Sequence, residues 1–174
     1  MFEYDSKEMY MKILFVQTGG TIDKDYPKVW KAYDFEITDP AVTRVLECIN
    51  PVFQYRVVSA CKKDSMDITK EDRQALFELC ATAPESHIVI THGTDTMAQT
   101  AGYLSKLTEK TIVITGSARP ERFSNSDASF NIGVAVGALQ TVQTGVYIAM
   151  NGVVAEWHVV QKSPKTGQFV EKKQ

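Results

Sequence analysis

The chain contains little cysteine, and the cysteines it has follow no redox or metal-binding pattern. There are three, Cys48, Cys61 and Cys80, an odd number without C-x-x-C spacing. This number and spacing are typical of structural thiols in a reducing compartment. Residues 1–11 are acidic and polar and lack the apolar core of a secretory signal. We therefore expect a cytoplasmic protein.

Further absences exclude several classes of partner. The net charge is −2, with mixed signs along the chain and no basic stripe, so we expect no nucleic acid. No apolar run approaches membrane-spanning length, which predicts no membrane contact. Neither G-x-G-x-x-G nor a P-loop motif occurs, so a nucleotide or phosphate is only a weak alternative. No second His, Cys or acid lies at metal-ligand spacing from His92, and we expect neither a metal nor a cofactor.

The composition predicts one globular domain, residues 1–174, with 44% hydrophobic and 23% charged residues. Short apolar runs predict strands at Lys12–Gln17, Gln54–Cys61, His87–Ile90, Thr111–Thr115 and Gly145–Met150. Helical patterns lie between them, at about 40–49, 69–81, 95–107 and 127–140. Asp39 before Pro40 and Thr69 are the expected caps of the first two helices.

Strand and helix alternate along the chain, which determines the expected fold class. This order predicts a doubly wound, mostly parallel sheet with right-handed crossovers, a flavodoxin-like three-layer α/β/α arrangement. The end of the chain differs, because Asn151-Gly152 separates two apolar runs. An Asn-Gly pair in this setting predicts an antiparallel hairpin at the C-terminal end of the sheet.

Two of the predicted strands run directly into turns rich in Thr and Gly. These turns are Thr18–Thr21 and Thr91–Thr96. In a parallel sheet both would lie at the carboxyl edge, where ligands bind. Glycine lets the backbone approach a ligand and exposes N–H donors, so a neighbouring hydroxyl is a candidate nucleophile. Local evidence also allows a structural turn, a capping role for Asp95 and a structural His92.

The same two turns carry a resemblance to a known family. Thr18-Gly19-Gly20-Thr21-Ile22 and His92-Gly93-Thr94-Asp95-Thr96 resemble the two signature segments of the bacterial-type L-asparaginases, which are threonine amidohydrolases. Other segments resemble that family in the same order, namely Lys63–Asp67, Thr115–Pro120, Ser126-Asp127, Phe130-Asn131 and Val160–Ser163. The resemblance covers nearly the whole chain.

The resemblance implies catalytic roles for particular residues. Thr21 would attack the side-chain amide carbon, and Tyr26 would match a tyrosine in a mobile lid, Asp23–Thr38, with Tyr33 as the alternative. Thr94, Asp95 and Lys162 would form a second triad that assists proton transfer. The sequence leaves open whether Lys162 is the base or only orients the Thr94–Asp95 pair. Without the resemblance, the residues around Lys162 would indicate an ordinary solvated lysine.

The resemblance also implies a substrate-binding set. Ser65 would bind the substrate carboxylate and Asp95 the α-ammonium group, with Gly20, Met66 and Thr94 completing the set. Many members have Gln or Ser where this chain has Met66, and methionine is only a weak acceptor. A simpler interpretation is that Ser65 caps a turn and that Asp127 and Asn131 cap and pin the fourth helix.

The expected function is hydrolysis of asparagine or a related small amide. The alternative is a non-catalytic amino-acid-binding module or regulator that keeps the same pocket. Full-length members continue with a smaller C-terminal domain that helps to recognise the substrate's amino group from a neighbouring subunit. The chain is most similar to a short, single-domain branch that corresponds to the N-terminal domain, and we expect a homo-oligomer.

Overall fold

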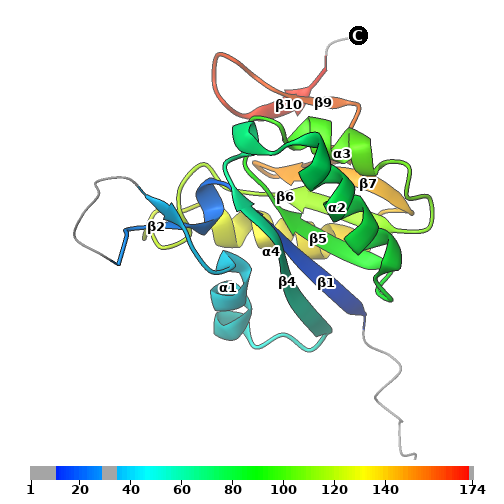
Figure 1. Cartoon of the computed structure of the whole chain (residues 1–174), viewed down its shortest axis with the longest axis horizontal. Coiled ribbons are helices and arrows are strands. Elements are labelled where there is room, and N and C mark those ends of the chain that lie inside the picture. Colours follow the sequence, from blue (N-terminus) through cyan, green and yellow to red (C-terminus); the bar gives the residue numbers. More distant parts are fainter. Residues whose placement is uncertain (1–10, 29–34, 173–174) are drawn as a thin grey trace, which may run out of the picture.

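The computed structural model describes residues 11–28 and 35–172. Its centre is a six-stranded sheet with the order β4-β1-β5-β6-β7-β8 (Figure 1). These strands are β1 (Lys12–Gly19), β4 (Gln54–Lys63), β5 (His87–Thr91), β6 (Thr111–Thr115), β7 (Gly145–Met150) and β8 (Val153–Glu156). Neighbours pair in parallel except for β7 and β8, which are antiparallel. The predicted mostly parallel sheet with an antiparallel end is confirmed.

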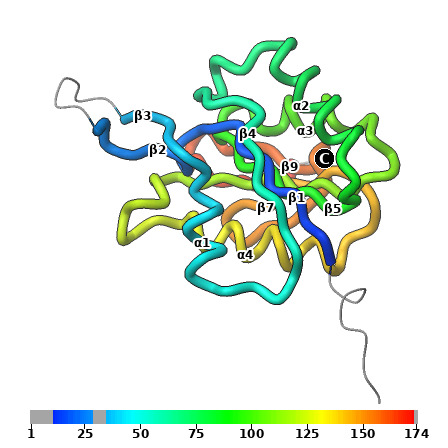
Figure 2. The backbone as a smooth tube through the Cα atoms, turned by 60° about the horizontal axis from the view of Figure 1, so that its bottom comes forward, coloured from blue at the N-terminus to red at the C-terminus, as the bar shows by residue number. Residues whose placement is uncertain are grey.

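Helices cover both faces of this sheet (Figure 2). They are α1 (Ala41–Ile49), α2 (Lys70–Thr82), α3 (Met97–Leu104) and α4 (Ala128–Leu139). Successive strand residues point to opposite faces, so Leu14 packs with α2 and α3, whereas Phe15 packs with α1 and α4. The result is one apolar layer on each face of the sheet, between the strands and the helices. This is the three-layer α/β/α arrangement that the sequence predicts.

The strand order identifies where a ligand would bind. From β1 the chain steps to β4 on one side and then returns to β5 on the other. This is the flavodoxin-like order, in which the crevice lies outside the carboxyl ends of the two strands where the order reverses. Here those strands are β1 and β5, and both signature turns follow them directly.

One crossover departs from the predicted right-handedness. The connections through α3 and α4 both step in the same direction along the sheet, yet α3 packs on the face of α2 and α4 packs on the face of α1. The β6–α4–β7 connection therefore has the opposite hand to the other parallel crossovers. To change faces, residues 116–127 pass over the carboxyl edge, and the Glu121 N–H there donates to the Ile22 carbonyl at 3.1 Å.

Two short hairpins and two turns complete the described chain. Strand β2 (Lys24–Asp25) pairs with β3 (Glu36–Ile37), and β9 (Val160–Lys162) pairs with β10 (Phe169–Glu171). Single turns of 3₁₀ helix span Thr21–Asp23 and Ser65–Asp67. The β9–β10 hairpin is not predicted by the sequence pattern, and it is anchored because Val160 and Phe169 are buried in the layer of α2 and α3.

The helix caps are predicted correctly for one helix and wrongly for another. Thr69 caps α2 in a capping box with Asp72, as expected. Asp39 does not cap α1, because its side chain is 83% exposed and bonds Lys62 at 3.2 Å. The first N–H of α1, that of Ala41, instead donates to the buried carboxyl of Asp23 at 2.7 Å. A carboxyl group from a distant part of the sequence thus occupies the position that the local pattern assigns to Asp39.

Candidate active site

The two signature turns are in direct backbone contact. Gly20 has a φ of 86°, and a Cβ built on it would lie 2.4 Å from both the N and Cα of Gly93. A side chain at position 20 cannot fit at this crossing, which explains why the first turn needs glycine there. Thr21 follows one glycine and Thr94 follows the other, so the contact brings the two candidate threonines to the same edge of the sheet.

A third segment, which follows β4, packs against the second turn. A Cβ on Gly93 would lie 2.8 Å from the Ser65 Cβ, and Ser65 itself is 3% exposed. Its hydroxyl accepts the Asp95 N–H at 3.3 Å, and its carbonyl accepts the Thr96 hydroxyl at 2.6 Å. The predicted substrate segment is therefore held against the Thr94–Asp95 turn by two hydrogen bonds.

Lys162 reaches this turn from the separate β9–β10 hairpin. Its Nζ donates to the Thr94 Oγ1 at 2.8 Å and to the Asp95 Oδ1 at 2.6 Å. The side chains of Lys162 and Asp95 are 33% and 56% exposed, so this ion pair adds little to fold stability. The Thr94 oxygen accepts from the ammonium group, which leaves the Thr94 hydroxyl proton free to donate elsewhere.

Two alternative interpretations of these residues are not supported by the contacts. Thr96, not Asp95, is the N-cap of α3, and no side chain caps that helix. Lys162 is not a fully solvated lysine, because both of its bonds join it to the second turn. The interpretation of Asp127 and Asn131 as structural is consistent with their bonds. Asp127 accepts the N–H groups of Ala118 and Arg119, although it does not cap α4 with its side chain.

Thr21, Tyr26 and Met66 form no hydrogen bonds with one another's side chains in the part of the chain that the structure describes. Thr21 is half-buried, and its hydroxyl has no hydrogen-bond partner within residues 11–28 and 35–172. Tyr26 is 66% exposed and packs on Phe35 with ring centroids 4.9 Å apart. Tyr33 lies outside the described residues. Met66 is 72% exposed.

His92 is a structural histidine, as the sequence suggests. It is fully buried, its Nδ1 lies 2.7 Å from the Gly93 carbonyl, and its Nε2 lies 2.8 Å from the Thr100 hydroxyl. The carbonyl can only accept, so Nδ1 donates and Nε2 accepts from Thr100, which in turn accepts from Arg73. Burial lowers the pKa of His92 to about 4, and the imidazole is neutral.

Sequence reasoning missed the residues that support the hairpin carrying Lys162. Asn131 is buried in α4 and accepts the Asn151 N–H at 3.2 Å, and the Asn151 side chain accepts the Phe169 N–H at 3.0 Å. The sequence pattern assigns Asn151 only to the β7–β8 turn, which it forms with a φ of 56°. Its side chain also connects the central sheet to β10.

Comparisons with known proteins identify the family to which the chain belongs. The family model "Asparaginase, N-terminal" matches residues 12–168. The chain belongs to the asparaginase family. It is 25% identical over 174 residues to a glutaminase-asparaginase of Pseudomonas fluorescens biotype A, covering 92% of this chain and 48% of that protein. It is 45% identical over 153 residues to a glutamyl-tRNA(Gln) amidotransferase component of Methanococcus maripaludis, covering 80% of this chain and 35% of that protein.

Among solved structures, L-asparaginase I of Vibrio cholerae superposes with a TM-score of 0.81 at 24% identity, over 95% of this chain and 52% of that one. This likeness confirms the fold. The chain spans about half the length of the first relatives it matches. The resemblance to the N-terminal domain of this family, made from the sequence, is thus confirmed.

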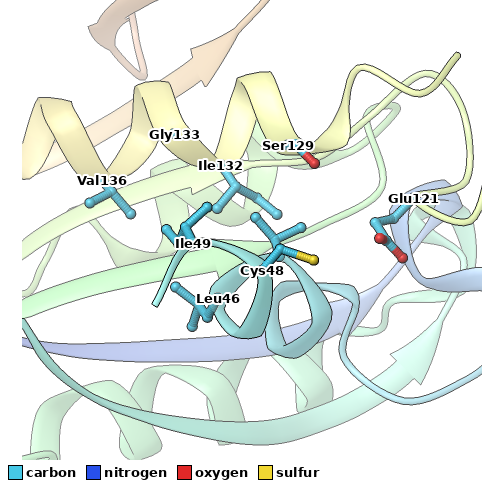
Figure 3. Close-up of a pocket in the computed structure, with 9 residues that line it drawn as sticks. Leu46, Cys48, Ile49, Glu121, Ser129, Ile132, Gly133 and Val136 are labelled. Atoms are coloured by element: carbon cyan, nitrogen blue, oxygen red, sulfur yellow. The ribbon is translucent and has the colours of Figure 1, made fainter. Parts of the chain in front are cut away.

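One cavity of this family member lies away from the predicted site residues. An apolar cavity of about 200 Å³ lies between α1 and α4, lined by Leu46, Ile49, Ile132 and Val136 among others (Figure 3). It lies on a helical face and contains no residue of either signature turn. Among the described residues, no group of three or more His, Cys, Asp or Glu could hold a metal ion. No helix in that part of the chain is long and apolar enough to cross a membrane.

Proposed function

We propose that the protein hydrolyses a small carboxamide, with L-asparagine as the first substrate to test and L-glutamine as the second. The observation that carries the proposal is the position of Lys162, 2.8 Å from the Thr94 hydroxyl and 2.6 Å from the Asp95 carboxylate. Family membership and the contact between Gly20 and Gly93 support it. The names of the relatives supply the two candidate amides.

In the proposed reaction the Thr21 oxygen attacks the amide carbon and forms an acyl-threonine. The Lys162 ammonium group donates a proton to the leaving nitrogen and regains one from Thr21 through the Thr94 hydroxyl, the C–N bond breaks, and ammonia leaves. Water then attacks the acyl group, releases the carboxylic acid and returns the proton to Thr21. A threonine hydroxyl is weakly nucleophilic at neutral pH, so it needs a neighbouring proton acceptor of this kind.

Substrate binding is proposed for the groups around this path. The Asp95 Oδ2 has no hydrogen bond to the described residues, so it is free to pair with a substrate ammonium group. Ser65 and the backbone at Gly20 would contact the carboxylate and the reacting carbonyl. Tyr26, in the β2–β3 hairpin that follows Thr21 in the chain, would approach the nucleophile only after its ring leaves Phe35.

Ammonia release from both amides tests the proposal directly. Thr21→Ala should lower the rate by about 10⁴-fold or more, because it removes the attacking atom. Thr21→Ser keeps a hydroxyl and should retain activity within about 100-fold of the wild type. Equal rates for wild type and Thr21→Ala would refute Thr21 as the nucleophile, and no ammonia from either amide would refute the hydrolase.

A non-catalytic binding module is the second candidate. Met66 favours it, because this side chain is 72% exposed at a position where the family resemblance places a polar substrate contact. Isothermal titration calorimetry with asparagine and aspartate separates the two functions. Binding with no ammonia release would favour the module.

We also propose a homo-oligomer in the cytoplasm. All three cysteines are free, which fits a reducing compartment. Light scattering of the purified chain measures the number of subunits, and a monomer at all concentrations would refute the first part of this proposal.

A further inference from the structure

Asp23 joins the turn that carries Thr21 to two neighbouring elements. It is fully buried, and its Oδ1 accepts the N–H of Ala41, the first residue of α1, at 2.7 Å. Its main-chain carbonyl accepts the N–H and the hydroxyl of Thr38 at 2.9 and 3.1 Å. Its own N–H donates to the Gly20 carbonyl at 3.2 Å. A single residue thus connects the turn to α1 and to the end of the β2–β3 hairpin.

The Thr91 hydroxyl lies near the Asp23 carboxyl and, like the second carboxyl oxygen of Asp23, lacks a hydrogen-bond partner in the part of the chain that the structure describes. Within the described residues, the Asp23 Oδ2 and the Thr91 hydroxyl are both buried without a hydrogen-bond partner. The Thr91 hydroxyl and the Gln17 side chain act on the Asp23 carboxyl from β5 and β1. Leaving either buried polar atom unpaired is costly, so a hydrogen bond between Asp23 and Thr91 is favoured. Thr91 is the first residue of the turn that contains Thr94.

The charges around Asp23 leave its carboxyl largely uncompensated. Arg44 of α1 is the charged group that acts on it, but the Arg44 Nε is bonded to Glu121 at 2.6 Å. Burial therefore dominates and raises the pKa of Asp23 to about 6, against the opposing effects of Ala41, Gln17, Arg44 and Thr91. Burial thus favours the neutral form of the carboxyl group, and its role in the fold depends on its hydrogen bonds and not on its charge.

We propose that Asp23 is a positioning residue that holds the Thr21 turn in register with the Thr94 turn, through Ala41 on one side and Thr91 on the other. This inference rests on the proposed function, because register between the turns matters only if Thr21 attacks a substrate. A fully buried carboxyl cannot touch that substrate. Asp23 acts through the backbone of the turn, so its loss should lower kcat more than it raises KM.

The first experiment compares Asp23→Ala and Asp23→Asn in steady-state ammonia release from asparagine. The alanine variant removes the hydrogen bond to Ala41 and the proposed one to Thr91, and kcat should fall by about 10–100-fold with KM within about threefold, because small misplacements of reacting groups are costly. In Asp23→Asn the new side chain can accept the Ala41 N–H and donate to the Thr91 hydroxyl, so the kcat of this variant should stay within about threefold of the wild type. Asp39→Asn is the matched control, since that carboxylate precedes the same helix but is exposed.

Thr91→Val extends the test without changing a charge. It should lower kcat by about 3–10-fold, and the Asp23→Ala/Thr91→Val double variant should lose no more than Asp23→Ala alone. Wild-type kcat in Thr91→Val, or a loss in Asp23→Asn as large as in Asp23→Ala, would overturn the proposal. If Asp23→Ala does not fold, the proposal is still tested by kcat in the other two variants, which should be lowered in Thr91→Val and close to the wild type in Asp23→Asn.

Amide NMR signals separate this inference from the proposed function. In Asp23→Ala or Thr91→Val the backbone signals of Gly20–Ile22 and Gly93–Asp95 should shift together, whereas Asp39→Asn should leave both sets in place. A chain that releases no ammonia but shows this joint shift would refute the hydrolase while keeping the link between the turns. Active wild type with unshifted Gly93–Asp95 signals in both variants would refute the link alone.

Discussion

Gly20 and Gly93 touch backbone to backbone, and this contact fixes the distance between the two signature turns. A Cβ on Gly20 would lie 2.4 Å from two backbone atoms of Gly93 and 3.0 Å from the carbonyl carbon of His92. Backbone atoms cannot rotate away as a flexible side chain could. The close approach of the two turns therefore depends on the lack of a side chain at Gly20, the residue before Thr21.

Gly20→Ala should therefore unfold or severely destabilise the protein. The added methyl group collides with backbone, and the φ of 86° is unfavourable for alanine, so we expect a loss of about 3 kcal/mol or more in the free energy of unfolding. Gly133→Ala is the matched control, because it lies in α4 with nothing within 4 Å of its added Cβ. That change should stabilise by about 0.5–1 kcal/mol. Urea unfolding measures both, and similar stabilities for the two variants would contradict the contact.

Lys162→Met should remove activity without removing stability. The ammonium group is the partner of both Thr94 and Asp95, and positioned proton transfer typically contributes about 10²–10⁴-fold to a rate. The pair is partly exposed to solvent, so the free energy of unfolding should change by less than about 1 kcal/mol. The measurements are kcat for ammonia release and urea unfolding.

Lys165→Met is the control for the lysine prediction. Lys165 is exposed in the loop between β9 and β10, on the same hairpin as Lys162. It should keep wild-type kcat. If both lysine variants lose activity equally, the effect belongs to the charge of the hairpin and not to the contacts with Thr94 and Asp95.

Asn151→Gly should loosen the hairpin that presents Lys162. Glycine tolerates the φ of 56° at this position but cannot accept the Phe169 N–H, so kcat should fall by about 10-fold. Asn151→Asp keeps an acceptor oxygen and also tolerates this φ, and its kcat should stay within about threefold of the wild type. Two equally active variants would show that the Asn151 side chain does not position the hairpin.

Sequence patterns predicted the parts of this protein that depend on neighbouring residues. The strand runs, the Thr69 cap and the Asn151-Gly152 turn are local features, and parallel strands place the ends of β1 and β5 at one edge. The family resemblance added Lys162, which lies 67 residues from Asp95 and on a strand of three residues, too short for a periodic signal.

Features that depend on distant packing could not be read from the sequence. Asp39 has the local pattern of a cap, but Asp23 occupies the site because the turn after β1 folds against α1. The hand of the β6–α4–β7 crossover depends on which face α4 packs against, and both faces of the sheet are apolar. The residues next to Asp39 and those within α4 therefore predict neither the cap of α1 nor the hand of this crossover.

Two buried groups, Asp23 and His92, should give opposite dependences of the free energy of unfolding on pH. Burial raises the pKa of Asp23 from 3.8 to about 6 and lowers the pKa of His92 from 6.5 to about 4. Between these values the folded protein holds a proton on Asp23 and none on His92. The unfolded chain holds one on His92 and none on Asp23. The two groups therefore bind equal numbers of protons in both states, and their slopes cancel between about pH 4.5 and 6.

Removing either group should expose the slope of the other. In Asp23→Asn the unfolded chain binds one proton more than the folded protein, so the free energy of unfolding should rise with pH by up to about 1.4 kcal/mol per unit relative to the wild type. In His92→Asn the folded protein binds one proton more, and stability should fall with pH at a similar rate. Urea unfolding across this window measures both slopes, with His158→Asn, an exposed histidine, as the control. Parallel curves for Asp23→Asn and wild type would mean that Asp23 is already ionised in the folded protein, and that its hydrogen bond with Ala41 is made by the charged carboxylate.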